Sequence, residues 1–467
     1  MCSGLRRYLP PWALLQVYLE STMKCSNGAE FVFVVNKIEE VDWDKLPYNF
    51  LSIYVSNYLT SLIHGLKGRS FGLDTIHRLS LKIHKVYHDK FRRYQYNQVP
   101  TLFVDSGGYS IIIGDVHPRH INKFIDCYNY FLKNFAGDSC DYIFSLDIPI
   151  FLKYPDYNKV SLLYELNKKS LQTGLRIVED NNLYDKFILV WQFKILKQYR
   201  IWNKIFTEDL PQELTKKVRN YALGGMVGLR AATGIKFSPF ISMVYKLLYL
   251  LYTNGIHNGR IHLLGIHGKH DRLLAHFLHK LFSEVYGVPV TISYDTANFQ
   301  ISGIKRPGKK MVAYGASGNI TPIRQLTKQD VYDICGRCDK LTEEMWHQVE
   351  YFRDNERCDN IVAFAQFNTA YEVTTDEILR DIVEQENMVE HFVKAKSQEQ
   401  FKKFVESVIS KYSHYPFISN YSFRIMANFE WIWPFHEWWV NSRNPDKLEE
   451  LNEKFIRAIN FPGDLQD

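Results

Sequence analysis

Short apolar runs recur along the first two thirds of the chain, and most are followed by a stretch with helical periodicity. The runs are rich in β-branched and aromatic residues, and each ends in a polar or glycine-containing turn. Their spacing leaves room for crossover helices, which favours parallel strands. The predicted strands are Phe31–Val35, Phe50–Val55, Thr101–Val104, Tyr142–Leu146, Phe187–Trp191, Tyr221–Met226, Ile261–Ile266 and Val290–Tyr294.

Eight such strands with helices between them predict an α/β protein that folds as a (β/α)₈ TIM barrel. A doubly wound open sheet is the alternative. Polar or glycine residues at the carboxyl ends of the strands favour the barrel, because there these ends converge on one mouth, whereas an open sheet spreads them along an edge. These residues are Asp105, Asp147, Gln192, Gly224, Gly225, His267 and Asp295.

The pattern changes after the last predicted strand. We expect an N-terminal extension over residues 1–28, a catalytic barrel over 29–325 and a mainly helical C-terminal region over 326–467. Amphipathic helices are predicted at Leu341–Arg353, Thr375–Phe392 and Lys394–Lys411. The aromatic residues crowded between Tyr412 and Trp439 form either the core of a helical cap or a platform that stacks on nucleic-acid bases.

Composition indicates a globular protein and excludes fibrous and disordered classes. Of 467 residues, 46% are hydrophobic and 23% are charged, close to the averages of soluble domains. No run is long and apolar enough for a membrane-spanning helix, and the N-terminus has no secretory pattern, so we expect a cytoplasmic protein without a membrane partner. Seven cysteines in such a chain predict reduced thiols.

The formal net charge of +6 is a weak indication of a polyanionic partner. Three local basic runs are more informative, because clustered lysine and arginine can hold a phosphate backbone. The alternative for each is a solvated face of the protein. The runs are Lys90–Tyr94, Lys269–Arg272 and Lys305–Lys310.

Two strand-end aspartates, Asp105 and Asp295, are the candidate catalytic residues. The barrel geometry brings them toward one substrate from different strands. Glycosyl transfer uses such a pair, because one ionised carboxylate stabilises or attacks the oxocarbenium-like centre while the other handles the proton of the leaving group. Alternatively, either aspartate caps a helix or binds a backbone amide or an arginine.

Other strand-end residues suit the recognition of a purine. Asp147 can accept two hydrogen bonds from the N–H groups of guanine, and Gln192 offers a donor and an acceptor. Gly224 and Gly225 expose backbone groups to a flat base. The apolar face against which the base stacks is assigned to Tyr109 or Met226.

Five motifs in order resemble the signature of the tRNA-guanine transglycosylase superfamily, over roughly residues 101 to 300. They are Asp-Ser-Gly-Gly-Tyr at 105–109, Leu-Asp-Ile-Pro at 146–149, Ala-Leu-Gly-Gly-Met-Val at 222–227, His-Leu-Leu-Gly-Ile at 262–266 and Ser-Tyr-Asp at 293–295.

The resemblance implies base exchange through a covalent intermediate. Asp295 would attack the anomeric carbon and expel guanine, Asp105 would act as general acid and then base, and Asp147, Gln192 and Gly225 would recognise the purine. The incoming free base would be a 7-deazaguanine, with no organic cofactor. Bacterial members that accept an aminomethyl base carry Val-Gly-Glu where this chain reads Val227-Gly-Leu229, so we favour the neutral 7-cyano-7-deazaguanine.

The resemblance also implies structural zinc, with a departure. Family members carry Cys-x-Cys-x-x-Cys and a later histidine, whereas this chain reads Asp333-Ile-Cys335-Gly-Arg-Cys338, with Phe367-Asn368 where the histidine is expected. A CxxC pair with two further ligands can still close a tetrahedron. The candidate ligands are Cys335, Cys338, Cys358 and His347. The alternative is a set of free cysteines in the helical cap.

The barrel motifs do not identify the polymer. The C-terminal region lacks a counterpart of the tRNA-binding module of archaeal members, and the combination resembles the divergent bacteriophage and bacterial branch that inserts 7-deazaguanine into DNA. We therefore expect DNA, with tRNA as the alternative, and the host cytoplasm as the location if a phage encodes the chain. A homodimer is a further expectation. Two other interpretations are a non-catalytic binding partner and a barrel hydrolase of small glycosides.

Overall fold

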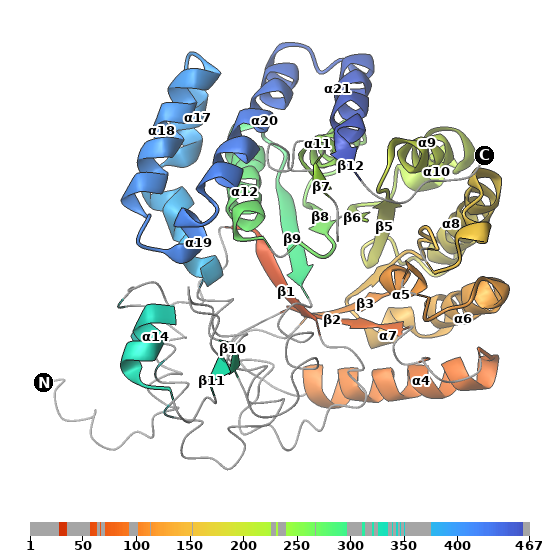
Figure 1. Cartoon of the computed structure of the whole chain (residues 1–467). Coiled ribbons are helices and arrows are strands. Elements are labelled where there is room, and N and C mark those ends of the chain that lie inside the picture. The colour runs from red at the N-terminus through yellow and green to blue at the C-terminus, as the bar shows by residue number, and fades with distance from the viewer. Residues whose placement is uncertain are drawn as a thin grey trace, which may run out of the picture.

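The computed structural model describes a barrel and most of the helices around it (Figure 1). The described residues are 28–34, 57–62, 66, 71–92, 101–112, 114–151, 153–225, 230–231, 240–266, 268–296, 311–312, 320–321, 326–334, 339, 342–343, 346, 350 and 375–460.

Eight parallel strands close into a barrel in the order β1-β2-β3-β4-β5-β6-β8-β9, and β9 pairs with β1. This arrangement confirms the predicted (β/α)₈ barrel and excludes the open sheet. The barrel strands are β1 (Glu30–Val34), β2 (Asn57–Ser61), β3 (Thr101–Asp105), β4 (Tyr142–Phe144), β5 (Phe187–Gln192), β6 (Asn220–Gly224), β8 (Gly259–Leu263) and β9 (Val290–Thr296).

The second barrel strand differs from the prediction. Residues 50–55, which lie outside the described part of the chain, were predicted for this position because they are strongly apolar. The structure places β2 there instead, in register with β3 from Asn57 opposite Thr101 to Ser61 opposite Asp105. Strand β2 ends in the buried polar residues Thr60 and Ser61, which lie close to the mouth. A search for apolar runs therefore passes over it.

Helices and short helical turns surround the barrel and connect its strands. They are α4 (Leu73–Val86), η4 (Tyr87–Phe91), α5 (Gly108–Ile112), η5 (Pro118–His120), α6 (Ile121–Asn134), α7 (Ala136–Ser139), η6 (Pro155–Tyr157), α8 (Val160–Asp180), α9 (Leu196–Lys204), η7 (Ile205–Asp209), α10 (Gln212–Thr215), α11 (Phe240–Thr253), α12 (Lys269–Lys280) and η8 (Leu281–Val285).

Alternate residues of the strands build two separate apolar layers, as the two-residue period of a strand requires. One layer packs against the helices, and the other fills the inside of the barrel with Val32, Val34, Leu59, Phe103, Phe144, Ile188, Val190 and Ala222. At the amino ends of the strands, Arg260 donates to Glu30 at 2.7 Å and lies over the ring of Tyr142 at 4.7 Å. Side chains therefore fill the interior of the barrel and close its amino-terminal end. This leaves the carboxyl ends of the strands to bind a substrate.

The C-terminal region is mainly helical, as predicted, and α20 packs on α11 and α12 (Figure 1). Trp438 and Trp439 are 4% and 1% exposed, so these two side chains belong to a core rather than to an exposed stacking platform. No helix among the described residues is long and apolar enough to cross a membrane. Besides helical residues 375–385, this region contains α14 (Lys328–Ile334), α17 (Met388–Lys394), α18 (Gln398–Lys411), α19 (Pro416–Ser419), α20 (Ser422–Asn441) and α21 (Pro445–Arg457).

Among the described residues, two short strand pairs lie outside the barrel. Strand β12 (Ile459–Asn460) pairs antiparallel with β7 (Arg230–Ala231), which follows the sixth barrel strand, and β10 (Met311–Val312) pairs with β11 (Ile320–Thr321). The β12–β7 pair places the last described residues of the chain beside the segment that follows β6.

An ion pair between a buried lysine and a partly exposed glutamate ties α21 to the barrel helices. The Lys246 ammonium of α11 lies 2.6 Å from a carboxylate oxygen of Glu449, and it also donates to the Tyr199 hydroxyl of α9 at 2.7 Å. Burial lowers the pKa of Lys246, while Glu449 favours its charged form. The carboxylate thus compensates part of the cost of burying the ammonium group.

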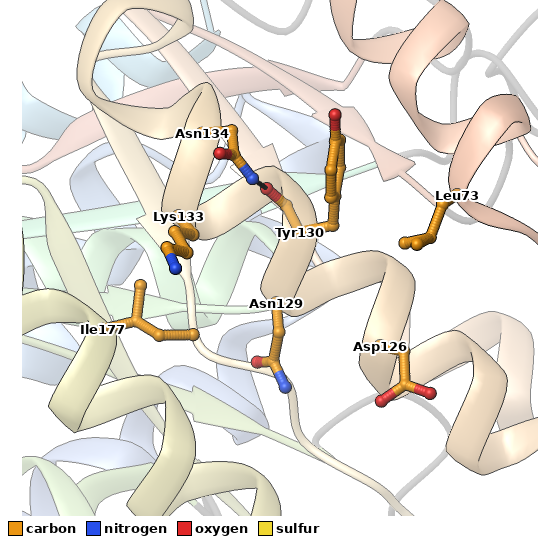
Figure 2. Close-up of a pocket in the computed structure, with 7 residues that line it drawn as sticks. All are labelled: Leu73, Asp126, Asn129, Tyr130, Lys133, Asn134 and Ile177. Carbon is orange, nitrogen blue, oxygen red and sulfur yellow. Dashed lines mark hydrogen bonds between the residues drawn. The ribbon is translucent and has the colours of Figure 1, made fainter.

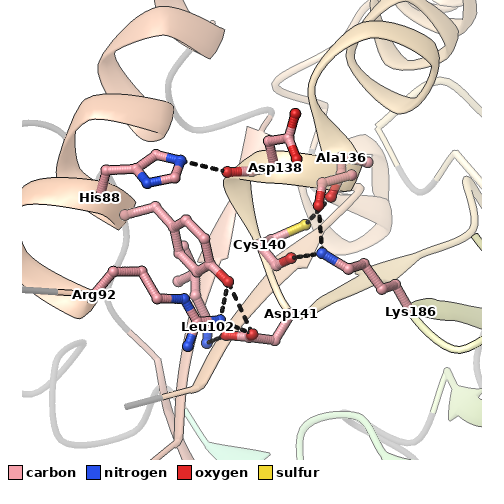
Figure 3. Close-up of polar contacts among 10 residues, drawn as sticks. His88, Arg92, Leu102, Ala136, Asp138, Cys140, Asp141 and Lys186 are labelled. Atoms are coloured by element: carbon pink, nitrogen blue, oxygen red, sulfur yellow. Dashed lines mark hydrogen bonds and ion pairs between the residues drawn. The ribbon is translucent and has the colours of Figure 1, made fainter. Parts of the chain in front are cut away.

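Asp141 organises the amino ends of β3 and β4 (Figure 3). Its carboxylate accepts a hydrogen bond from the Leu102 amide at 2.9 Å and another from the Tyr87 hydroxyl at 2.9 Å, and it pairs with Arg92. Burial, followed by the charge of Asp141, raises the pKa of Tyr87, so this hydroxyl remains a donor at neutral pH.

We expect Asp141→Ala to lower the free energy of unfolding by about 2 to 3 kcal/mol, because two partly buried donors lose their acceptor. Urea unfolding of the full chain measures this difference. Asp138→Ala is a matched control, since that side chain is exposed on the neighbouring α7. Equal midpoints for the two variants would contradict the assignment.

Candidate active site

The predicted strand-end residues lie at the same end of the barrel. Asp105, Gln192 and Gly224 are the last residues of β3, β5 and β6, and Asp295 lies one residue before the end of β9. Asp147 follows β4 after two further residues. Five different strands therefore deliver one carboxylate, amide or backbone group each to the mouth, where TIM barrels hold their active sites.

Asp105 is the most strongly perturbed acid of this group. Desolvation of its carboxyl group, followed by the charges of Asp147 and Asp295, raises the pKa of Asp105 to about 8. The amide of Gly107 opposes this shift only in part. At neutral pH Asp105 therefore carries a proton that it can donate. The charge effects of Asp147 and Asp295 on Asp105 also indicate that the three carboxyl groups share one site.

Asp147 is held against the turn that follows Asp105. The Ser106 hydroxyl donates to its carboxylate at 3.2 Å, and a Cβ on Gly108 would stand only 2.5 Å from it. Glycine at 108 therefore allows the carboxylate to approach this closely. Desolvation raises the pKa of Asp147 to about 6, so it is mostly ionised at neutral pH and can accept donors from a ligand.

The α8 side chain of Asn167 fixes the backbone beside Asp147. Its amide oxygen accepts from the Ile148 N–H at 2.8 Å, and its amide nitrogen donates to the Ile148 carbonyl at 2.9 Å. Ser170, one turn further along the same helix, donates to the Leu146 carbonyl at 3.3 Å. Asp147 is therefore presented from a loop whose flanking residues are bound on both sides.

Asp295 is buried, with 7% of its surface exposed, and one of its carboxylate oxygens is bound by two neighbours. The Gly265 amide donates to Oδ1 at 2.9 Å, and His262 Nε2 lies 3.1 Å from the same atom. The other nitrogen of His262 lies 2.9 Å from the Ser293 hydroxyl. His262 itself is fully buried inside the barrel.

Gln192 presents a buried polar atom to the mouth. The residue is 3% exposed, and within the described part of the chain its Oε1 has no hydrogen-bond partner. Burial of an amide oxygen without a partner costs free energy, which a ligand that donates to this atom would recover. The atom lies beside Gly224, where an added Cβ would be 2.0 Å away.

Several residues predicted to lie at the mouth or to bind zinc fall outside the described structure. These are Met226, His267, the side chain of Tyr109 and the zinc-ligand candidates Cys335, Cys338, Cys358 and His347. Among the residues that are described, no group of three or more histidine, cysteine or acidic side chains could hold a metal ion. The two described cysteines, Cys127 and Cys140, are free and buried.

Arginines from two of the basic runs form ion pairs within the protein. Arg92 lies at the opposite end of the barrel, where it pairs with Asp141, because the chain returns along α4 and η4 to the amino end of β3. Arg272 is fully buried and lies 3.6 Å from Asp376 in the C-terminal region. Lys305–Lys310 lies outside the described residues.

His262 is the site residue that the sequence pattern did not reveal. It stands in an otherwise apolar strand and is separated from Asp295 by a whole helix, so only the register of β8 against β9 brings the two together. The useful signal was its position two residues before Leu264-Gly265, within the motif at 262–266.

A separate surface pocket lies on the outside of the barrel (Figure 2). It is formed by α4, α6 and α8 and lined by Leu73, Asp126, Asn129, Tyr130, Lys133, Asn134 and Ile177. These residues belong to the helical layer rather than to the strand ends, and none of the perturbed carboxyl groups lines the pocket. We therefore place the candidate site at the mouth.

The arrangement at the mouth combines a protonated acid, an ionised acid and a buried carboxylate with one bound oxygen. Such a set can protonate a leaving group, bind hydrogen-bond donors and attack an electrophilic carbon. Neither a comparison with known protein families nor one with curated proteins found a match to this chain. The assignment of a reaction therefore rests on the residues themselves.

Proposed function

We propose that this protein is a guanine transglycosylase that exchanges guanine in DNA for a 7-deazaguanine through a covalent aspartyl intermediate. The observation that carries the proposal is the difference between the carboxyl groups that share the mouth. Asp105 has its pKa raised to about 8, while Asp147 has its pKa raised only to about 6. Two acids with separated pKa values can take different roles at one pH.

In the first step, a carboxylate oxygen of Asp295 forms a bond to the anomeric carbon of the target nucleoside. The glycosidic bond breaks, and the guanine departs with the electron pair and a proton from Asp105. In the second step, Asp105, now ionised, removes a proton from the incoming base. That base attacks the anomeric carbon, and the electrons of the ester bond return to Asp295.

The base-recognition groups follow from the same geometry. Ionised Asp147 accepts hydrogen bonds from the N–H groups of the purine, and the buried Oε1 of Gln192 supplies a further acceptor. The backbone at Gly225 completes the edge that faces the base. The base must leave the duplex to reach these groups, because the glycosidic carbon is inaccessible within the stack.

The finer parts of the proposal rest on the motifs at 222–229 and on the C-terminal region. Val227-Gly-Leu229 offers no acid to a cationic substituent, which favours 7-cyano-7-deazaguanine as the incoming base. We favour DNA over tRNA as the substrate because the C-terminal region does not resemble a tRNA-binding module. Structural zinc on the cysteines at 335, 338 and 358 stays part of the proposal.

Incubation of the purified protein with radiolabelled guanine and either duplex DNA or tRNA tests the reaction and the polymer together. We expect label to accumulate in DNA. If label accumulates in tRNA alone, tRNA is the substrate instead of DNA. No label in either, with no shift of nucleic acid in a gel at low salt, would favour a hydrolase of small glycosides. Mass spectrometry of nucleosides from cells supplied with a deazaguanine identifies the inserted base.

Adjacent glycines give a matched pair of variants for the base site. In Gly224→Ala the new Cβ clashes with the end of the Gln192 side chain and makes an ordinary contact with Val190, so the amide must move while the fold is retained. We expect the KM for guanine to rise roughly tenfold, the effect of losing one hydrogen bond to a ligand, with little change in melting temperature.

Gly225→Ala is a contrasting variant in the same base site. Gly225 has φ of 84°, and its Cβ would lie 2.1 Å from the Phe193 carbonyl oxygen, so this variant should lower the melting temperature. Guanine titration and thermal unfolding separate the two effects. An unchanged KM in Gly224→Ala would remove Gln192 from the base site.

A further inference from the structure

His262 has no role in the steps above, yet it is bound directly to the proposed nucleophile. It lies on β8 opposite Ser293 of β9, and its side chain bridges Ser293 and Asp295, two residues apart on the same strand. The ring is fully buried among the apolar side chains that fill the barrel. Its centroid is 5.8 Å from that of Phe103 and 4.9 Å from that of Phe144.

The two hydrogen bonds determine the tautomer of this histidine. An ionised carboxylate can only accept, so the proton of a neutral ring must stand on Nε2 and point to Asp295. Nδ1 then has a lone pair, and the Ser293 hydroxyl donates to it. Desolvation lowers the pKa of His262, which agrees with a neutral ring at physiological pH.

Both donors to Asp295 bind the same oxygen. His262 Nε2 lies 3.1 Å and the Gly265 amide 2.9 Å from Oδ1, which leaves Oδ2 without a bond to either group. The amide belongs to the loop that leaves β8, and the ring belongs to β8 itself. Two donors, one from β8 and one from the turn that follows it, therefore set the rotation of the carboxylate.

We propose that His262 is a positioning residue that, together with the Gly265 amide, holds Oδ1 of Asp295 so that Oδ2 is the atom that attacks the anomeric carbon. This inference rests on the proposed function. In the covalent intermediate Oδ2 carries the ester bond and Oδ1 becomes its carbonyl oxygen. In the second step negative charge returns to the carboxylate, and the donors already in place stabilise it.

Kinetics of labelled-guanine exchange by the full chain test the role with three variants. His262→Phe removes both hydrogen bonds and keeps an aromatic ring between Phe103 and Phe144. We expect kcat to fall about 10²-fold, the usual effect of removing one oriented donor, with KM within about twofold. His262→Gln keeps a donor for Asp295 and an acceptor for Ser293, so it should recover most of this loss.

Ser293→Ala is the matched control, because it removes only the hydrogen bond that is remote from the nucleophile. It should lower kcat less than His262→Phe does. The phenylalanine variant should still fold with a modestly lower melting temperature, because its ring fills the same apolar space while the buried Ser293 hydroxyl and Asp295 carboxylate each lose one partner. Equal kcat in His262→Phe and wild type would overturn the positioning role, as would a fall that Gln does not rescue.

Nitrogen NMR of ¹⁵N-histidine protein gives a readout that does not depend on turnover. The signal that disappears in His262→Phe should report protonated Nε2 and unprotonated Nδ1, and it should shift in Asp295→Ala. A proton on Nδ1 would overturn the inference while leaving guanine exchange intact. Absence of exchange by a wild type that shows the expected tautomer would overturn the proposed function and with it this role.

Discussion

Replacing Asp295 with asparagine should reduce guanine exchange on the order of 10⁴-fold or more, because the reaction loses the atom that forms the covalent bond. The amide keeps the size of the carboxylate. Its oxygen can still accept hydrogen bonds from His262 and Gly265, which bind Oδ1 of the aspartate in the wild type. The variant should therefore fold and bind nucleic acid as the wild type does. Only the chemical step should be lost.

The loss should be visible in the intermediate as well as in the rate. Wild-type protein mixed with substrate and no free base should form an adduct with nucleic acid that survives denaturation on a gel, and Asp295→Asn should form none. Asp185→Asn is the control, since that carboxylate is 80% exposed at the amino end of β5 and pairs with Arg219 at the surface. An adduct in the Asp295 variant would assign the nucleophile to another residue.

The sequence predicted the barrel and the acids at its mouth for a physical reason. Parallel strands are buried on both sides and therefore apolar, and they end where a polar or glycine residue begins a loop, so Asp105, Gln192 and Gly224 were visible at the ends of their runs. Short-range pattern sufficed for these positions.

What the sequence pattern missed depends on contacts across the barrel. Strand β2 carries polar residues toward the mouth, so a more apolar neighbouring segment was predicted in its place. The pairing of His262 with Asp295 follows from the register of two strands and leaves no trace in local periodicity. Arg92 was assigned to nucleic acid because a basic run does not disclose which end of the barrel it occupies.

The pKa shifts link the same geometry to pH. Protonation of Asp147 should remove its acceptor capacity below about pH 6, and ionisation of Asp105 should remove the acid above about pH 8. Exchange should therefore follow a bell-shaped profile between these limits. Each limb belongs to a named carboxyl group and can be tested separately.

Replacing Asp105 with asparagine should lower exchange roughly 10² to 10⁴-fold, the contribution of general acid–base catalysis. The alkaline limb near pH 8 should disappear from the residual activity, because asparagine does not ionise there. Measuring kcat from about pH 5 to pH 9 in wild type and variant checks both effects. A limb that persists near pH 8 in the variant would assign it to another group.

The Asp105→Asn variant should gain stability although it loses activity. The pKa of Asp105 is about 8 in the folded protein, against an ordinary value of 3.8 for an exposed aspartate in an unfolded chain. Between these two values the folded chain therefore holds one more proton than the unfolded chain, and the contribution of Asp105 to stability falls as pH rises through this window. Asparagine removes this penalty, so the variant should gain in melting temperature over the wild type as pH rises toward about 8.

This opposition distinguishes a catalytic acid from a structural one. If a carboxyl group were retained for folding, its substitution would lower the stability of the protein at every pH. Asp105 instead lies near like charges and away from water, and the free-energy cost of this placement rises with pH. A melting-temperature difference that does not grow between about pH 5 and about pH 8 would contradict the raised pKa. The same carboxyl group would then be ionised at neutral pH and could serve only as a base.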